Sequence, residues 1–124
     1  MSLKIVFMGT PEFSIPTLKI LKESKHEIIC VYTQPPKKKS RGQRILKNAV
    51  HIFSEKEGIK VRTNQLSNKE EYENFIKLKA DLVVVIAYGQ IIPEIFLKNP
   101  NLIFLNVHAS LLPKLRGAAP IERA

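Results

Sequence analysis

Two polar side chains stand together at the end of an apolar segment. Asn106 and His108 lie two positions apart, directly after the apolar residues 102–105. Residues two apart on an extended strand project from the same face of a sheet. An amide can donate a hydrogen bond to a carbonyl oxygen, and an imidazole exchanges protons near neutral pH, so the pair could stabilise an oxyanion and protonate a leaving group. The same spacing also fits a structural, hydrogen-bonded Asn–His pair.

The other histidines and the cysteine form no comparable group. We expect His26, before an apolar segment, and His51, on a predicted helix, to be solvent-exposed. Cys30 lies among apolar β-branched residues, where a buried and unreactive thiol is expected. Three scattered histidines and one cysteine do not resemble a metal site. A single cysteine also allows no internal disulfide, which fits the reducing cytoplasm.

Positive charge is concentrated in one segment of the chain. The formal net charge is +9, and residues 34–47 contain six positive residues and no acidic one. The positive residues are Lys37, Lys38, Lys39, Arg41, Arg44 and Lys47. Such a segment attracts phosphate backbones, with an affinity that falls as salt rises. Pro35, Pro36 and Gly42 predict a loop, and a solvated loop without a ligand is the alternative interpretation.

Strands and helices are predicted to alternate along the chain. Short apolar runs predict strands at residues 3–8, 27–33, 59–62, 82–87 and 102–107. Helical spacing predicts one helix with Phe13, Thr17, Ile20 and Leu21 on its inner face, and others at residues 48–57, 67–79 and 93–97. Val50 and Phe53 should face inward, Gly58 should end its helix, and the S-N-K-E sequence at residues 67–70 has the pattern of a capping box.

This order of elements indicates an α/β protein with an open, Rossmann-like parallel sheet and flanking helices. Ligands bind such sheets outside the carboxyl ends of the strands, where residues 9–11, 87–90 and 106–110 should meet. The first of these segments lacks a G-x-G-x-x-G fingerprint, and the chain has no P-loop, so NAD, FAD and ATP are not expected. No apolar run approaches the length of about 18 residues that a membrane span needs, and no secretory leader is seen, so no membrane partner is expected.

Five segments resemble the methionyl-tRNA formyltransferases. They are N-V-H-A-S-L-L-P at residues 106–113, R-G-A-A-P-I at 116–121, F-M-G-T-P-E-F at 7–13, Y-T-Q-P at 32–35 and A-Y-G at 87–89. An N-x-H motif with S-L-L-P is typical of folate-dependent formyltransferases in general. The R-G-A-A-P-I and G-T-P-E-F segments narrow the resemblance to the tRNA enzymes.

This resemblance implies transfer of a formyl group from 10-formyltetrahydrofolate to the methionine amino group of initiator methionyl-tRNA, with no metal and no protein partner. By position, Asn106 would polarise the formyl oxygen, and His108 would stabilise the tetrahedral intermediate and help protonate the departing folate nitrogen. The folate site would include Ser110, Leu111, Leu112 and Pro113, with Tyr88 and Gly89 in the pterin pocket. The tRNA would contact Lys39, Arg41 and Arg44, with Arg41 reaching the acceptor end.

The sequence also departs from the family pattern. Pro36 replaces a usual Asp, Asn48 and Ala49 replace a usual Ser-Pro, and Leu115 replaces a common Trp. The resemblance covers only the N-terminal part of the family's usual length. Residues 1–124 are therefore expected to be the N-terminal portion of the catalytic domain, with a sheet truncated at its C-terminal side and an open edge. The family's catalytic aspartate and its C-terminal tRNA-binding domain would be absent, so little or no turnover is expected from this chain alone.

Two other functions stay open. The chain could be another folate-dependent formyltransferase, acting on a purine precursor or an amino sugar, although the G-T-P-E-F turn and the basic segment favour tRNA. It could also be a non-enzymatic, basic nucleic-acid-binding domain in which Asn106 and His108 are structural. That alternative predicts salt-sensitive tRNA binding without a response to folate.

Overall fold

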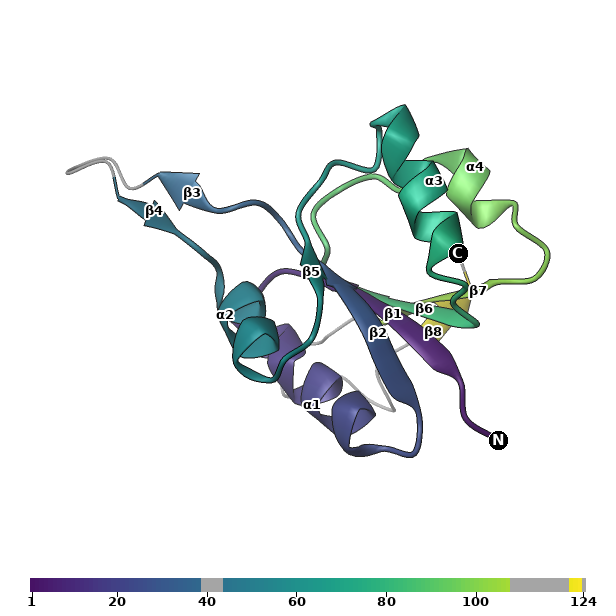
Figure 1. Ribbon diagram of the computed structural model, residues 1–124, viewed down its shortest axis with the longest axis horizontal. Coiled ribbons are helices and arrows are strands. Elements are labelled where there is room, and N and C mark those ends of the chain that lie inside the picture. The colour runs from purple at the N-terminus through teal and green to yellow at the C-terminus, as the bar shows by residue number, and fades with distance from the viewer. Residues whose placement is uncertain (39–43, 108–120, 124) are drawn as a thin grey trace, which may run out of the picture.

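The protein is built on a sheet with helices on both faces, as the computed structural model shows (Figure 1). The structure describes residues 1–38, 44–107 and 121–123. The strands, in their order across the sheet, are β5 (Val61–Arg62), β2 (Glu27–Tyr32), β1 (Lys4–Gly9), β6 (Leu82–Ile86), β7 (Ile103–Val107) and β8 (Ile121–Arg123). The first five strands are parallel, and β8 runs antiparallel to β7. The predicted Rossmann-like α/β fold is confirmed.

The apolar strands form two cores because successive side chains point to opposite faces of the sheet. Ile5 and Phe7 belong to one core, whereas Val6 and Met8 belong to the other. The first core is covered by α1 (Ile15–Glu23) and α2 (Ala49–Lys56), and the second by α3 (Lys69–Lys77) and α4 (Glu94–Leu97). With helices on both faces, β6 has no side that faces water, which explains its unbroken apolar sequence.

The helix between β1 and β2 differs from its prediction. A 3-10 turn, η1 (Glu12–Ser14), precedes α1, so Phe13 is not part of the α-helix. Leu18 is the buried residue of α1, whereas Ile20 is 69% exposed. The predicted inner face was therefore wrong at Phe13 and Ile20, because the 3-10 turn delays the start of the regular helix.

The start and stop signals of the next helices are confirmed, with one shift. Asn48 caps α2, Val50 is fully buried, and Gly58 follows the helix with a φ of +73°, a conformation that glycine adopts readily. The cap of α3 is Asn68 and not Ser67, because the Asn68 side chain accepts a hydrogen bond from the Glu70 amide at 2.9 Å.

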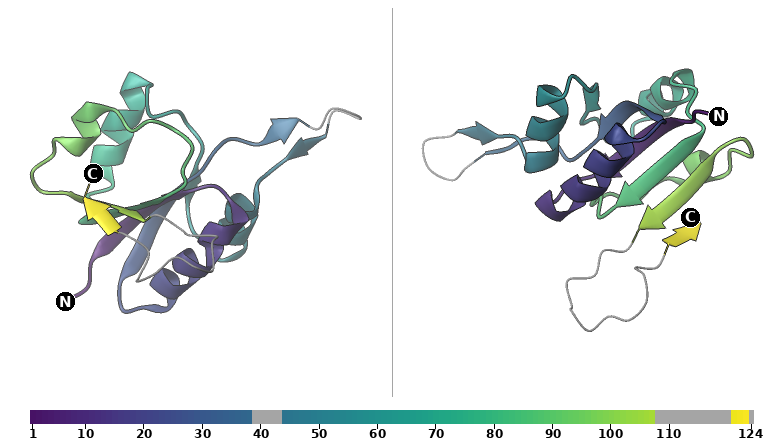
Figure 2. Two further views of the ribbon diagram at one scale, coloured as in Figure 1. Left: turned by 180° about the vertical axis from the view of Figure 1, so that it is seen from behind. Right: turned by 90° about the horizontal axis from the view of Figure 1, so that it is seen from below.

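The predicted basic loop contains a short two-stranded ribbon. In this ribbon β3 (Lys37–Lys38) pairs antiparallel with β4 (Ile45–Leu46). We call these two strands the basic ribbon, and it projects away from the body of the protein (Figures 1 and 2). Both strands are exposed, so the sequence carried no apolar alternation that would have predicted them. The antiparallel strand β8 beside β7 was not predicted either, and it occupies the side of β7 where an open edge was expected.

Burial of the histidines and the cysteine corrects one expectation. His51 is only 7% exposed, because α2 turns its ring against the body, so the expected solvent exposure was wrong. His26 is half-buried, and its Nδ1 accepts a hydrogen bond from the Leu3 amide at 2.9 Å. Cys30 is buried as expected, and burial raises the pKa of its thiol to about 11. Across the described ranges, no helix is long and apolar enough to cross a membrane.

Candidate functional site

The carboxyl ends of three parallel strands come together as predicted. Thr10 directly follows β1, and its hydroxyl donates a hydrogen bond of 2.7 Å to the carbonyl oxygen of Tyr88, just after β6. Asn106 lies near the end of β7, opposite Val85 of β6. Polar residues of all three segments therefore gather at the sheet edge where ligands of open α/β sheets bind.

A cavity of about 370 Å³ lies at this edge, and Tyr88, Gln90 and Asn106 line it together with Phe13. The structure thus brings together Asn106 and Tyr88, which were assigned to one site from sequence. Asn106 is half-buried, and its side chain makes no hydrogen bond within residues 1–38 and 44–107. A polar amide at the wall of a cavity can donate to a carbonyl or oxyanion of a ligand.

The ring of Tyr88 points into the core and not toward solvent. It is 2% exposed, and its hydroxyl has no hydrogen-bond partner among the described residues. Burial raises the pKa of this phenol, and the charge of Glu71 and the Cys30 thiol raise it further, so the hydroxyl stays protonated. The Tyr88 hydroxyl is therefore not available to a ligand, and the polar groups of this turn are backbone groups and the Gln90 side chain.

The turn after β6 is held by two glutamines that the sequence analysis missed. Gln34 donates from Nε2 to the carbonyl oxygen of Gly89 at 2.8 Å, and Gln90 donates to Gln34 Oε1 at 3.2 Å. The amide of Leu66 donates to Gln90 Oε1 at 3.1 Å. Gly89 has a φ of +91°, and a Cβ at this position would lie 2.7 Å from Gln34 Nε2. Gln34 lies two residues after the end of β2 and Gln90 four residues after the end of β6, and that position was the signal available in the sequence.

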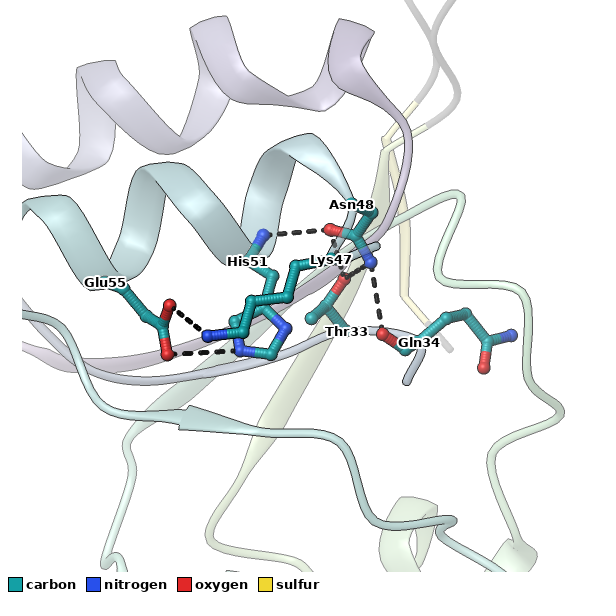
Figure 3. Close-up of polar contacts among 6 residues, drawn as sticks. All are labelled: Thr33, Gln34, Lys47, Asn48, His51 and Glu55. Atoms are coloured by element: carbon teal, nitrogen blue, oxygen red, sulfur yellow. Dashed lines mark hydrogen bonds and ion pairs between the residues drawn. The ribbon is translucent and has the colours of Figure 1, made fainter. Parts of the chain in front are cut away.

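The root of the basic ribbon is fastened by Asn48 (Figure 3). Its Oδ1 accepts from the His51 amide at 2.8 Å, which caps α2. Its Nδ2 donates to Thr33 Oγ1 at 3.0 Å and to the carbonyl oxygen of Gln34 at 3.1 Å. One side chain therefore joins the residues that precede the ribbon to the residue that follows it.

A second cavity, of about 500 Å³, lies at the root of the basic ribbon. Its lining includes Thr10 and Gln34 together with Lys37, Lys38 and Lys47. The Lys47 ammonium lies 2.8 Å from Glu55 Oε1, and this hydrogen bond lowers the pKa of the Glu55 carboxyl. The arrangement favours an anionic ligand, because the lysines outnumber the acids at this cavity.

Several predicted site residues fall outside the described residues. They are Lys39, Arg41, His108, Ser110, Leu111, Leu112 and Pro113. The remaining tRNA candidate, Arg44, is exposed and directly precedes β4. Gly89 lines a separate cavity of about 410 Å³ with Gln34 and Gln90, and not the one that holds Asn106.

A buried charged cluster that was not predicted from the sequence lies behind the site. Glu71 of α3 is 1% exposed and accepts hydrogen bonds from the Tyr32 hydroxyl and the Arg62 guanidinium, whose Nη2 lies 2.8 Å from Oε1. Burial alone would raise the pKa of Glu71, but these hydrogen bonds hold it below its ordinary value. The cluster fixes α3 to β2 and β5, which support one wall of the sheet edge.

Comparison with known proteins identifies the family of this chain. Residues 3–124 match the Formyl transferase family. The chain belongs to this formyl transferase family. It is 55% identical over 126 residues to a methionyl-tRNA formyltransferase of Pelagibacter ubique (strain HTCC1062), an alignment that covers 100% of this chain and 41% of the relative. It is 52% identical over 123 residues to the methionyl-tRNA formyltransferase of Paramagnetospirillum magneticum, covering 98% of this chain and 40% of the relative.

This formyl transferase chain thus spans about two-fifths of the length of these curated relatives. Solved structures support the fold. A phosphoribosylglycinamide formyltransferase from Anaplasma phagocytophilum superposes with a TM-score of 0.57 at 20% identity, over 94% of this chain and 54% of that one. The phosphoribosylglycinamide formyltransferase from Brucella melitensis gives a TM-score of 0.57 at 21% identity, over 94% of this chain and 62% of that one. At this identity the likeness establishes the fold alone.

Proposed function

We propose that this chain is part of a methionyl-tRNA formyltransferase, which transfers the formyl group of 10-formyltetrahydrofolate to the amino group of initiator methionyl-tRNA in the cytoplasm. The observation that carries the proposal is the pairing of two cavities at one sheet edge. One cavity presents the Asn106 amide, and the other lies among lysines at the root of the basic ribbon. Thr10 lines the second cavity and donates to the carbonyl of Tyr88, which lines the first.

The donor side of the proposal rests on Asn106 and the turn at Tyr88. A cavity of about 370 Å³ lies within the range of roughly 300–1,000 Å³ that is usual for small-molecule sites, which suits the ring system of a folate. The amine of methionine attacks the formyl carbon, the carbonyl oxygen becomes an oxyanion, and the attacking nitrogen releases one proton to water. We assign Asn106 to donate a hydrogen bond to that oxygen, and His108, on the strength of its sequence motif, to deliver a proton to the folate nitrogen as the carbon–nitrogen bond breaks. No metal is part of this scheme.

The acceptor side rests on the basic ribbon. Lys37, Lys38 and Lys47 line the second cavity, and Arg44 is exposed beside it. Lysine and arginine bind phosphates chiefly through charge, and a transfer RNA is the acceptor that best matches such a surface. We assign Lys39 and Arg41 to the same surface from their places in the sequence. A purine precursor or an amino sugar carries far less charge and would leave most of these cations without a partner.

The experiment is a chimaera in which residues 1–124 replace the matching segment of the Pelagibacter ubique enzyme, which is 55% identical over this range. The chimaera is assayed with 10-formyltetrahydrofolate against methionyl-tRNA, glycinamide ribonucleotide and an amino sugar nucleotide. We expect turnover with methionyl-tRNA alone. Formylation of either other acceptor at a comparable rate would refute the acceptor assignment.

Asn106→Ala in the chimaera tests the proposed oxyanion donor. Loss of one such donor costs about 10²–10³ in kcat, and the affinity for the folate should change much less because the interaction strengthens only as the oxyanion forms. Asn101→Ala, an exposed position before β7, is the matched control and should leave kcat unchanged. An Asn106→Ala variant with the kcat of the control would show that the amide is structural.

A further inference from the structure

A chain of hydrogen bonds runs from Asn48, just after the basic ribbon, to the turn after β6. Asn48 Nδ2 donates to Thr33 Oγ1 at 3.0 Å, and the Thr33 hydroxyl donates to Thr10 Oγ1 at 3.4 Å. The Thr10 hydroxyl then donates to the carbonyl oxygen of Tyr88 at 2.7 Å. The Thr33 hydroxyl has one hydrogen, which it can donate either to Thr10 Oγ1 or, at 3.3 Å, to Asn48 Oδ1, so Thr33 lies within hydrogen-bond distance of both neighbours.

The chain of hydrogen bonds is shielded from water at its centre. Thr33 is fully buried, and Thr10 and Asn48 are half-buried. The backbone amide of Gln34, the first residue of the basic segment, also donates a hydrogen bond to Thr10 Oγ1, at 3.3 Å. Hydrogen bonds in such surroundings face little competition from water and are costly to leave unmade.

We propose that Asn48, Thr33 and Thr10 form a positioning clasp, which holds the root of the basic ribbon at a fixed place relative to the turn at Tyr88. This inference rests on the proposed function and adds the residues that align its two substrate sites. The clasp joins both ends of the basic segment, at Gln34 and Asn48, to the carboxyl end of β6. RNA bound to the ribbon is thereby held in a fixed position relative to the cavity that Asn106 lines.

Asn48 caps α2 through its Oδ1 and takes part in the clasp through its Nδ2, and substitution can separate these two roles. Asn48→Asp keeps the oxygen that caps α2, because Asp is as good an N-cap residue as Asn. It replaces the Nδ2 donor, which lies 3.1 Å from the Gln34 carbonyl oxygen, by a carboxylate oxygen that cannot donate to it. Asn48→Ala removes the cap and the clasp together. Asn68→Asp, at the cap of α3, is the matched control for the change of charge.

Amide hydrogen exchange of the 124-residue chain reports each role directly. In Asn48→Asp we expect the Gln34 amide to exchange about tenfold faster, while the His51 amide, which the cap protects, changes by less than about twofold. In Asn48→Ala both amides should exchange faster, and in Asn68→Asp neither should change. Unaltered exchange of Gln34 in Asn48→Asp would overturn the clasp, whatever the protein binds.

Binding of initiator tRNA to the same chain tests the consequence. Thr33→Val breaks the middle of the clasp without changing charge, so we expect the Kd for tRNA to rise about tenfold. The slope of log Kd against log salt should stay the same, because that slope counts phosphate contacts. An unchanged Kd in a Thr33→Val variant that keeps the exchange rate of its His51 amide would overturn the inference. If Thr33→Val fails to fold, the exchange rate of the Gln34 amide in Asn48→Asp is the measurement that tests the clasp. Absence of tRNA binding by both the unaltered chain and the chimaera would instead refute the proposed function.

Discussion

Replacing the buried Glu71 by glutamine tests the charged cluster behind the site. Its two carboxylate oxygens accept hydrogen bonds from the Tyr32 hydroxyl and from two nitrogens of the Arg62 guanidinium. Glutamine offers one acceptor oxygen in place of two and turns an NH₂ group toward a donor. The variant therefore leaves a cation without its counter-charge and at least one donor without an acceptor.

The expected loss of stability follows from the burial of the pair. Removing one partner of a buried ion pair costs about 3–5 kcal/mol. The Arg62 side chain is 21% exposed and Glu71 only 2%, so water offsets part of the loss on the arginine side. We expect Glu71→Gln to lower the free energy of unfolding by about 2–4 kcal/mol, a large share of the roughly 5–15 kcal/mol of a typical domain.

The same cluster should give a defined pH dependence. The native pKa of Glu71 lies below its unfolded value, so its contribution is present above about pH 4.3 and is lost as pH falls through the native pKa. The pKa of Tyr32 is raised by burial and by its hydrogen bond to Glu71. Its contribution is therefore present below about pH 10 and is lost as pH rises further. In Glu71→Gln the free energy of unfolding should therefore depend less on pH in the acid range.

Urea unfolding at several pH values provides the measurement, with Glu73→Gln as the control. Glu73 is exposed on the same helix, and its substitution should change stability by less than about 0.5 kcal/mol. A Glu71→Gln variant that unfolds at the same urea concentration as the control at neutral pH would refute the role of the cluster. A free energy of unfolding that falls with decreasing pH as steeply as in the unaltered protein would also refute it.

Three further predictions follow from particular contacts. Gly89→Ala should destabilise the protein by about 1 kcal/mol more than Gly58→Ala in urea unfolding, because both positions have positive φ but only Gly89 would displace Gln34 and its hydrogen bonds. An equal loss would contradict this reasoning. Tyr88→Phe should leave stability unchanged or raise it by up to about 1 kcal/mol, because it removes a buried hydroxyl without a partner among the described residues; a clear loss of melting temperature would count against it. Cys30 should react with a thiol reagent only at the rate of unfolding, and rapid modification of the native protein would disprove its burial.

Most of the fold could be predicted because burial imposes strong patterns. The run at β6 is apolar at every position because helices cover both faces of the sheet, and Gly58 marks the end of α2 because its backbone needs a positive φ. The basic ribbon could not be predicted in this way. Its strands are two residues long and exposed, so no side-chain alternation distinguishes them from a loop.

Some residues of the site also had a local signal in the sequence, and others had none. Asn106 could be selected from sequence because a polar residue near the end of an apolar strand contradicts its surroundings. Asn48 and Glu71 could not, because each lies beside or within a polar stretch, and the partner of Gln34 could not be predicted because it lies far along the chain. Glu71 meets Tyr32 from 39 positions away, and Gln34 meets Gly89 from 55 positions away. No local spacing encodes such pairs, since they depend on the order of the strands in the sheet.

Strand order also explains why one threonine can serve both proposed substrate sites. In the sequence, Thr10 is 23 positions from Thr33 and 78 positions from Tyr88. In the sheet, β1 lies between β2 and β6, so the residue that follows β1 must lie between the residues that follow its two neighbours. Its hydroxyl can therefore accept from the root of the basic ribbon and donate to the turn at Tyr88, beside the direct hydrogen bond from the Gln34 side chain to Gly89. The proposed function brings a large RNA and a small formyl donor to one carbon atom, which requires such a fixed relation, and the parallel order of β2, β1 and β6 supplies it.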